Sequence, residues 1–237
     1  MQDVRYWYAS PADRAAQDAV NAAAAAQADR TLAEAWQSRR TYPLVVTQGD
    51  GNLGVKGKNF EMLFSIAGAG PASLKVNGTE WLWRAPRPAF WRASTDNDRG
   101  CGFPLRAAAW MAADVFVTYN GMKVLEAGPD CVKVQFQFGI PTVPGASAEL
   151  VYTVEAQDAL RVDAVYHGVA GAPELPCFGV KFETFGPVTR TVWTGLSGET
   201  YPDRYKGGVF GCHEETPHVE PHLVPPVSYT HLRAHET

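Results

Sequence analysis

The polar residues best suited to chemistry stand close together between residues 88 and 102. Two carboxyl groups and one amide are followed there by two glycines that let the backbone bend, at Asp96, Asn97, Asp98, Gly100 and Gly102. Neighbouring carboxyl groups can perform general acid–base catalysis or bind a hard cation. The alternative is structural: the two aspartates bond backbone N–H groups and pair with Arg92 or Arg99. The residue types favour this structural interpretation.

A second group of candidate ligands stands near the C-terminus and could bind zinc: His213, Glu214, Glu215, His218, Glu220 and His222. Their spacing fits no zinc-protease motif, and Pro217 and Pro221 break any helix that would align them. We therefore expect no metal site here. Residues 194–204 lack the G-x-S-x-G frame of a nucleophilic serine. Asp203 and Arg204 could form an ion pair, and a structural role is favoured for this segment.

Four aromatic residues surround Arg84 and Arg92, and they are Trp81, Trp83, Phe90 and Trp91. Aromatic rings can stack on the apolar faces of sugars or anchor an interface. Their strand-like spacing favours positions in the core instead.

Composition excludes several classes of protein. The 237 residues carry a net charge of −4, which argues against a nucleic-acid partner. No apolar run approaches the roughly 18–20 residues that cross a bilayer, so we expect no membrane partner. The four cysteines are widely spaced, and the N-terminus lacks the pattern of a secretory signal. Reduced thiols and a cytoplasmic location are therefore expected.

The first 40 residues differ from the rest, because eleven of the 21 residues between 15 and 35 are alanine. Ser10 and Pro11 are typical of a helix start, and alanine is the strongest helix former. We predict a peripheral Ala-rich helix or linker over residues 1–40.

Residues 41–226 alternate between apolar and polar side chains, which is typical of strands in an antiparallel sheet with one buried face. Examples are residues 132–138, 150–155 and 178–183. Asn77 and Gly78 indicate a hairpin turn, and one helix is expected from Pro104 to about residue 113. Many short strands separated by turns predict an all-β fold, a large antiparallel β-sandwich.

Several motifs in order resemble the β-galactosidase small chain, which is the C-terminal β-sandwich region of long bacterial β-galactosidases and a separate small subunit in some bacteria. The motifs occupy residues 48–55, 77–86, 90–100, 110–114, 173–180 and 194–204. The resemblance covers residues 44–225 and implies a sandwich of the galactose-mutarotase-like type.

The resemblance implies a role in hydrolysing terminal β-D-galactosides such as lactose with retention of configuration. Such chemistry needs two carboxylates about 5–5.5 Å apart. In the family these belong to a barrel domain that this chain lacks, as do most Mg²⁺ and Na⁺ ligands. We therefore assign no catalytic residue, cofactor or metal ligand to this chain. The implied partners are a large catalytic chain or domain within an oligomeric enzyme, and the β-galactoside substrate.

The resemblance also implies a mobile loop at the border of the active site, with Gly100 as its hinge. Such a loop excludes water and completes the sugar pocket. The candidate substrate-site residues are Asp96, Asn97, Asp98, Arg99, Gly100, Cys101, Gly102 and Phe103. Cys101 to Pro104 resembles the separate small subunit more than the long chains.

Two further expectations concern the whole chain. Residues 227–237 resemble the translation of a sequencing-library adapter, so we expect a non-native tail after a sandwich that is incomplete at its C-terminus. An alternative function is a non-catalytic carbohydrate-binding β-sandwich, which would bind galactose or lactose without a partner.

Overall fold

The computed structural model describes residues 15–16, 19–24, 26–27, 30–31, 34, 41–94, 96–186, 188–196 and 210–216. The chain divides into two compact units. One unit is Arg39–Phe185, and the other combines Met1–Ser38 with Gly186–Thr237.

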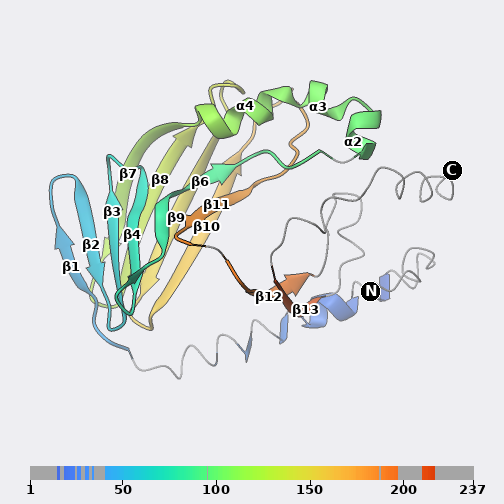
Figure 1. Cartoon of the computed structure of the whole chain (residues 1–237). Coiled ribbons are helices and arrows are strands. Elements are labelled where there is room, and N and C mark those ends of the chain that lie inside the picture. Colours follow the sequence, from blue (N-terminus) through green and yellow to red (C-terminus); the bar gives the residue numbers. More distant parts are fainter. Residues whose placement is uncertain are drawn as a thin grey trace. The chain divides into compact units, whose positions relative to one another are not determined.

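The larger unit is an antiparallel β-sandwich (Figure 1). Its first sheet has the order β1-β2-β3-β4-β5, with strands Val45–Gln48, Asn52–Lys56, Phe60–Ser65, Gly70–Val76 and Thr79–Glu80. The predicted turn joins β4 to β5, where Asn77 and Gly78 have φ values of 50° and 80°. Both residues occupy the left-handed region that a tight two-residue hairpin turn requires.

The second sheet has the order β10-β9-β8-β7. Its strands are β7 (Thr118–Ala127), β8 (Cys131–Gly139), β9 (Ser147–Glu155) and β10 (Ala159–His167). In β8 the residues alternate strictly between more and less buried positions, as their sequence pattern predicts. The all-β antiparallel fold expected from the sequence is confirmed.

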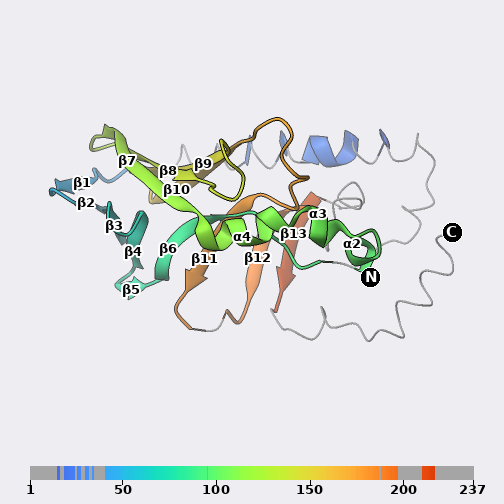
Figure 2. The ribbon, with the colours of Figure 1, turned by 90° about the horizontal axis from the view of Figure 1, so that it is seen from above.

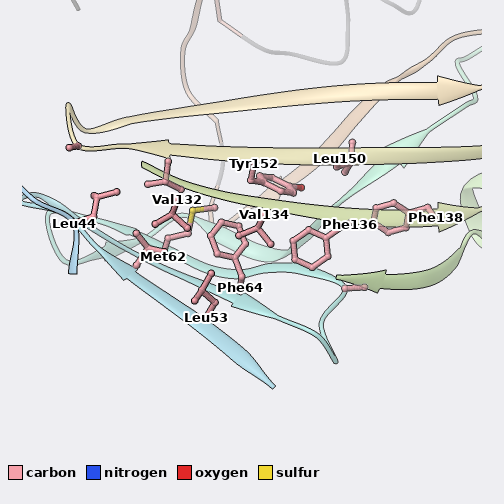
Figure 3. Packing of buried hydrophobic residues seen from close by; sticks show 14 residues of the cluster. Leu44, Leu53, Met62, Phe64, Val132, Val134, Phe136, Phe138, Leu150 and Tyr152 are labelled. Atoms are coloured by element: carbon pink, nitrogen blue, oxygen red, sulfur yellow. The ribbon is translucent and has the colours of Figure 1, made fainter. Parts of the chain in front are cut away.

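The two sheets face each other across the main core (Figure 3). Phe64 from β3 packs against Phe136 and Tyr152 of the opposite sheet, with ring centroids 6.1 and 5.8 Å away. Seen from above, β7 to β10 form one layer and β1 to β6 lie in the other (Figure 2). The remaining two strands of this unit, β6 (Leu82–Ala89) and β11 (Gly179–Thr184), pair antiparallel with each other.

Three short helices follow β6 at one end of the sandwich (Figure 1), and the second and third of them contribute buried residues to a second core. They are α2 (Asp96–Gly100), α3 (Phe103–Arg106) and α4 (Ala108–Phe116). The prediction of a helix from Pro104 to about residue 113 is confirmed in part, because the region is helical but consists of two helices, α3 and α4. The helix is interrupted at Ala107, whose φ of −99° and ψ of 11° depart from helical values. This break lets Phe103 and Trp110 both enter the second core.

The described residues of the smaller unit comprise helical residues and one pair of antiparallel strands. Every described residue between 15 and 34 is helical, as the alanine content predicts. Strands β12 (Thr191–Leu196) and β13 (Phe210–Glu215) pair antiparallel, and Arg190 bonds both carboxylate oxygens of Glu214 at 2.6 and 2.8 Å.

Among the described residues, no helix is long and apolar enough to cross a membrane. All four cysteines are free thiols, as expected.

The sandwich should depend strongly on the rings between its sheets. Phe136 is completely buried, so Phe136→Ala should lower the free energy of unfolding by about 3–5 kcal/mol. The control is Val45→Ala, which removes a side chain that is 61% exposed and should change stability by about 0.5 kcal/mol or less. Urea unfolding followed by circular dichroism measures both. Similar effects of the two substitutions would contradict the assigned core.

Glu80 links β4 to the start of β6 through hydrogen bonds to its carboxylate. Its carboxylate accepts backbone N–H bonds from Leu74, Trp81 and Leu82 at 2.9, 3.1 and 3.1 Å. It also accepts a hydrogen bond from the Ser73 hydroxyl. Burial alone would raise the pKa of Glu80, but the bond from Ser73 and the three backbone bonds together lower it.

This lowered pKa predicts acid sensitivity. The ionised Glu80 stabilises the fold above its ordinary pKa of 4.5, and this stabilisation is lost as the pH falls through the lower folded pKa. At pH 7, Glu80→Gln should cost about 1–2 kcal/mol, because bonds to a charged acceptor are replaced by weaker ones. The difference from wild type should shrink below pH 4.5. Unfolding experiments across this pH range, with Glu174→Gln as the exposed control, test it; a constant difference would contradict the role of the charge.

Candidate functional site

The chain reaches the candidate site at the end of β6, where Phe90 is completely buried. The Phe90 N–H donates a hydrogen bond of 2.6 Å to the Asp114 carboxylate on α4. Bonds to a charged acceptor are stronger than neutral ones. This bond therefore fixes the distance between the residue that follows β6 and the helix that follows the loop.

A cluster of aromatic rings packs against the same junction between β6 and α4. The Phe90 ring lies 5.7 Å from Trp110, 6.2 Å from Tyr166 and 5.8 Å from Phe178, measured between ring centroids. The Trp110 indole N–H donates to the Pro173 carbonyl at 3.0 Å. The cluster thus joins β6, α4, β10 and the segment before β11 into one support.

Asp98 is held by Arg92 through both carboxylate oxygens. Arg92 Nη1 lies 2.5 Å from Asp98 Oδ2, and Nη2 lies 3.2 Å from Oδ1. Both side chains are largely buried, with exposed fractions of 23% and 15%. The Arg92 guanidinium also lies over the Phe103 ring, 5.8 Å from its centroid. The structural interpretation of Asp98 is therefore the one that the geometry supports.

The loop turns at Gly102 rather than at Gly100. Gly102 has φ of 68° and caps the N-terminus of α3, so it occupies the left-handed region that favours glycine. Gly100 is the last residue of α2, and its φ is not positive. The N–H groups of Cys101 and Gly102 donate to the carbonyls of Asn97 and Arg99 at 3.0 and 3.2 Å.

Cys101 and Arg106 close the other side of the loop. Arg106 donates a hydrogen bond to the Cys101 carbonyl, and its Nη2 lies 3.9 Å from the Cys101 sulfur. The Cys101 thiol donates to the Asp98 carbonyl at 3.4 Å. Asp98 within α2 and Cys101 directly after it are therefore each bonded to an arginine outside α2.

The eight candidate residues differ in their exposure to solvent. Asn97, Arg99, Gly100 and Cys101 are exposed, while Phe103 is buried in the second core. Asp96 begins α2, and its side chain lies outside the described part of the chain. The exposed side chains can meet a ligand or partner, whereas Asp98 and Phe103 position the backbone.

No metal centre is present among the residues that the structure describes, since no three histidine, cysteine, aspartate or glutamate side chains gather there. His213 lies on β13, with its ring 5.4 Å from Trp193 and its Nε2 atom 3.2 Å from the Gly195 carbonyl. His218, Glu220, His222, Asp203 and Arg204 lie outside the described residues.

The core assignment was wrong for two of the four aromatic residues. Trp81 and Trp83 are 53% and 58% exposed, whereas Phe90 is buried. The Trp83 ring packs edge-on against Phe185, with centroids 4.9 Å apart. The pairing of β6 with β11 is irregular beside Phe182, which is also exposed. Such an irregularity redirects side chains that simple alternation would place in the core.

Sequence reasoning missed Asp114 and Arg106 as supports of the loop. Asp114 is the only charged residue of α4, and that isolation in an apolar helix was the available signal. A charged side chain in such a setting usually has a specific partner. The partner, the Phe90 N–H, is 24 residues away and could not be found from spacing.

The Arg92–Asp98 pair should govern the order of the loop. Asp98→Asn removes the charge-assisted bonds, so exchange of the Cys101 and Gly102 amide hydrogens should accelerate about tenfold or more. Asn97→Ala is the control, because Asn97 is an exposed neighbour on the same helix. Hydrogen exchange followed by mass spectrometry or NMR measures both variants. Equal exchange in wild type and Asp98→Asn would show that the pair does not hold the loop.

The family described as "Beta galactosidase small chain" matches residues 56–227, which is more than half of the chain. The motif-bearing loop and its supports all fall inside this range.

Individual relatives agree with the family match. The chain is 43% identical over 209 residues to the "Beta-galactosidase small subunit" of Latilactobacillus sakei, covering 80% of this chain and 66% of that protein. It is 35% identical over 172 residues to the "Beta-galactosidase" of Clostridium acetobutylicum, and 34% over 199 residues to that of Streptococcus thermophilus. Those two alignments cover 72% and 82% of this chain but only 19% of each relative. The chain therefore belongs to the β-galactosidase small-chain family and spans only part of the length of its relatives.

Proposed function

We propose that this chain acts as part of a β-galactosidase, in which it borders and gates a sugar site whose catalytic carboxylates stand on a separate barrel domain. The family match carries this proposal. A relative named as a small subunit implies a larger partner chain. The proposed substrates are terminal β-D-galactosides such as lactose, hydrolysed with retention of configuration. The free thiols fit a cytoplasmic enzyme.

The hydrogen bonds of Asp98 support placing the catalytic carboxylates on a separate domain. A retaining glycosidase needs a nucleophilic carboxylate and an acid/base carboxyl group about 5–5.5 Å apart. Both oxygens of Asp98 are bonded to Arg92, so this carboxylate is committed to holding the loop. We assign the two catalytic carboxylates, and the Mg²⁺ and Na⁺ sites, to the partner.

The candidate loop supports a gating role. It exposes Asn97, Arg99 and Cys101 to solvent, while arginines bond the Asp98 carboxylate and the Cys101 carbonyl and Phe103 is buried in the second core. A polar surface on a supported short segment can cover a bound sugar and exclude water from the reacting bond. The left-handed Gly102 gives the loop a backbone turn that other residues adopt only with strain.

Mixing experiments test the assignment to a two-part enzyme. The purified chain, a β-galactosidase large chain such as that of Latilactobacillus sakei, and the mixture are assayed on an aryl β-galactoside. We expect no turnover by this chain alone and a gain of about a hundredfold on mixing, since a site that lacks its positioning loop loses orientation and water exclusion. The Latilactobacillus sakei small subunit serves as the positive control. Strong activity of this chain alone, or no gain where the control succeeds, would refute the proposal.

A loop variant separates gating from assembly. Gly102→Ala places a side chain at φ of 68°, which costs about 1–2 kcal/mol in the closed turn. In the mixture, kcat/KM should fall about tenfold while the affinity for the large chain stays unchanged. Gly128→Ala is the matched control, because Gly128 lies in the turn before β8 and its φ is not positive. A parallel loss of affinity and activity would indicate a purely structural loop.

A second candidate function rests on the exposed rings of Trp81 and Trp83. Aromatic rings of this exposure can stack on sugars, as in a non-catalytic carbohydrate-binding module. Titration with galactose or lactose, followed by tryptophan fluorescence, distinguishes the two functions. Saturable binding without a large chain that is lost in Trp83→Ala would favour the binding module.

A further inference from the structure

The helices beside the candidate loop carry an unusual outer surface. Four large apolar side chains of α3 and α4 are exposed, and we call them the outer stripe: Leu105, Met111, Val115 and Phe116. Their exposed fractions are 85%, 55%, 74% and 60%. Single exposed apolar residues are ordinary on protein surfaces, but four large ones within the twelve residues 105–116 are an unusual concentration that is typical of an interaction site.

Helix α4 is apolar on two faces. Trp110 and Ala113 enter the second core, while Met111 and Val115 face away from it. Met111 and Val115 are four residues apart and therefore lie on the same side of the helix. A helix with apolar side chains all round is normally covered on every side. The inner face packs in the second core, whereas the outer face is not covered by any residue in the described part of the chain.

Charge distribution separates the outer stripe from an ordinary solvent face. The only charged residue of α4 is Asp114, and its carboxylate accepts the N–H bond from Phe90. A solvated helix face usually carries charged side chains, whereas the cores of protein interfaces are depleted in charge and enriched in methionine and aromatic residues. Met111 and Phe116 fit the second description.

We propose that the outer stripe is the docking surface for the large catalytic chain of the β-galactosidase. This inference rests on the proposed function and assigns one surface to that partner. The same segment makes up 19% of the long relatives, so most of each such enzyme lies outside the matched region and is joined to it in one polypeptide. The surface between this segment and the much larger rest of the enzyme is expected to be apolar and extensive.

Continuity with the loop determines which part of the partner is contacted. Leu105 is two residues after Phe103, where the candidate substrate-site loop ends. Docking through the outer stripe therefore brings the exposed Asn97, Arg99 and Cys101 to the partner together with α3 and α4. The partner surface is an apolar patch beside its own sugar site. Burying Leu105 and Phe116 would also restrain both ends of the helical segment that carries the loop.

The test uses the full chain with the double substitution Leu105→Glu and Val115→Glu. Both side chains are exposed, so thermal unfolding should match wild type. The Kd for a β-galactosidase large chain, measured by biolayer interferometry, should rise at least about thirtyfold, because two charges would be buried without partners. The matched control places the same charges at Val45 in β1 and at Ile66 in the turn after β3, which are 61% and 40% exposed. It should change the Kd by less than about threefold.

The outcomes separate this inference from the proposed function. If wild type neither binds nor activates the large chain, both fail. If wild type binds and activates but the stripe variant does so equally well, the docking surface lies elsewhere and the proposed function stands. If the stripe variant instead abolishes a dimer of wild type seen by light scattering and leaves the large-chain Kd unchanged, the outer stripe binds a second copy, which overturns the inference.

Discussion

The hydrogen bond from the Phe90 N–H to Asp114, together with the aromatic cluster beneath it, is the constraint on which the candidate site depends. It joins the end of β6 to α4 across the loop that contains Asp98. With both ends of the helical segment held, the loop has few ways to arrange the residues between them. Trp110 extends the support by bonding the Pro173 carbonyl, so the segment before β11 contributes as well. The loop therefore takes its position from the second core of the sandwich.

The sandwich supplies a rigid base for this arrangement. Two sheets meet over rings such as Phe64, Phe136 and Tyr152, whose close packing leaves few alternative arrangements. The sheet of β7 to β10 contributes to both cores, because Ala148 near one end of β9 belongs to the second core while Leu150, Tyr152 and Val154 belong to the main core. The candidate site is thus built from short segments attached to a closely packed framework. This is the arrangement that a gate at the border of a sugar site requires.

The two proposals describe one end of the larger unit from two sides. The loop offers polar side chains suited to a sugar, and the outer stripe offers apolar side chains suited to a protein surface. Arg92 and Arg106 lie at the junction, where each bonds a residue of the loop. A partner docked on Met111 and its neighbours would be connected to the loop through only a few residues. Assembly and closure of the site would then be coupled by covalent continuity, without a separate signalling element.

The sequence by itself determined what local chemistry controls. Alternation predicted β8 and β9, the Asn77 turn followed from residues that tolerate positive φ, and ordered motifs identified the family. Only the tertiary structure decided the rest. In the folded chain the expected helix is interrupted at Ala107. Trp81 and Trp83 are exposed beside an irregular strand pairing, and both carboxylate oxygens of Asp98 are bonded to Arg92. The physical reason is that spacing defines the face on which a side chain lies, whereas burial and bonding depend on which distant segment covers that face.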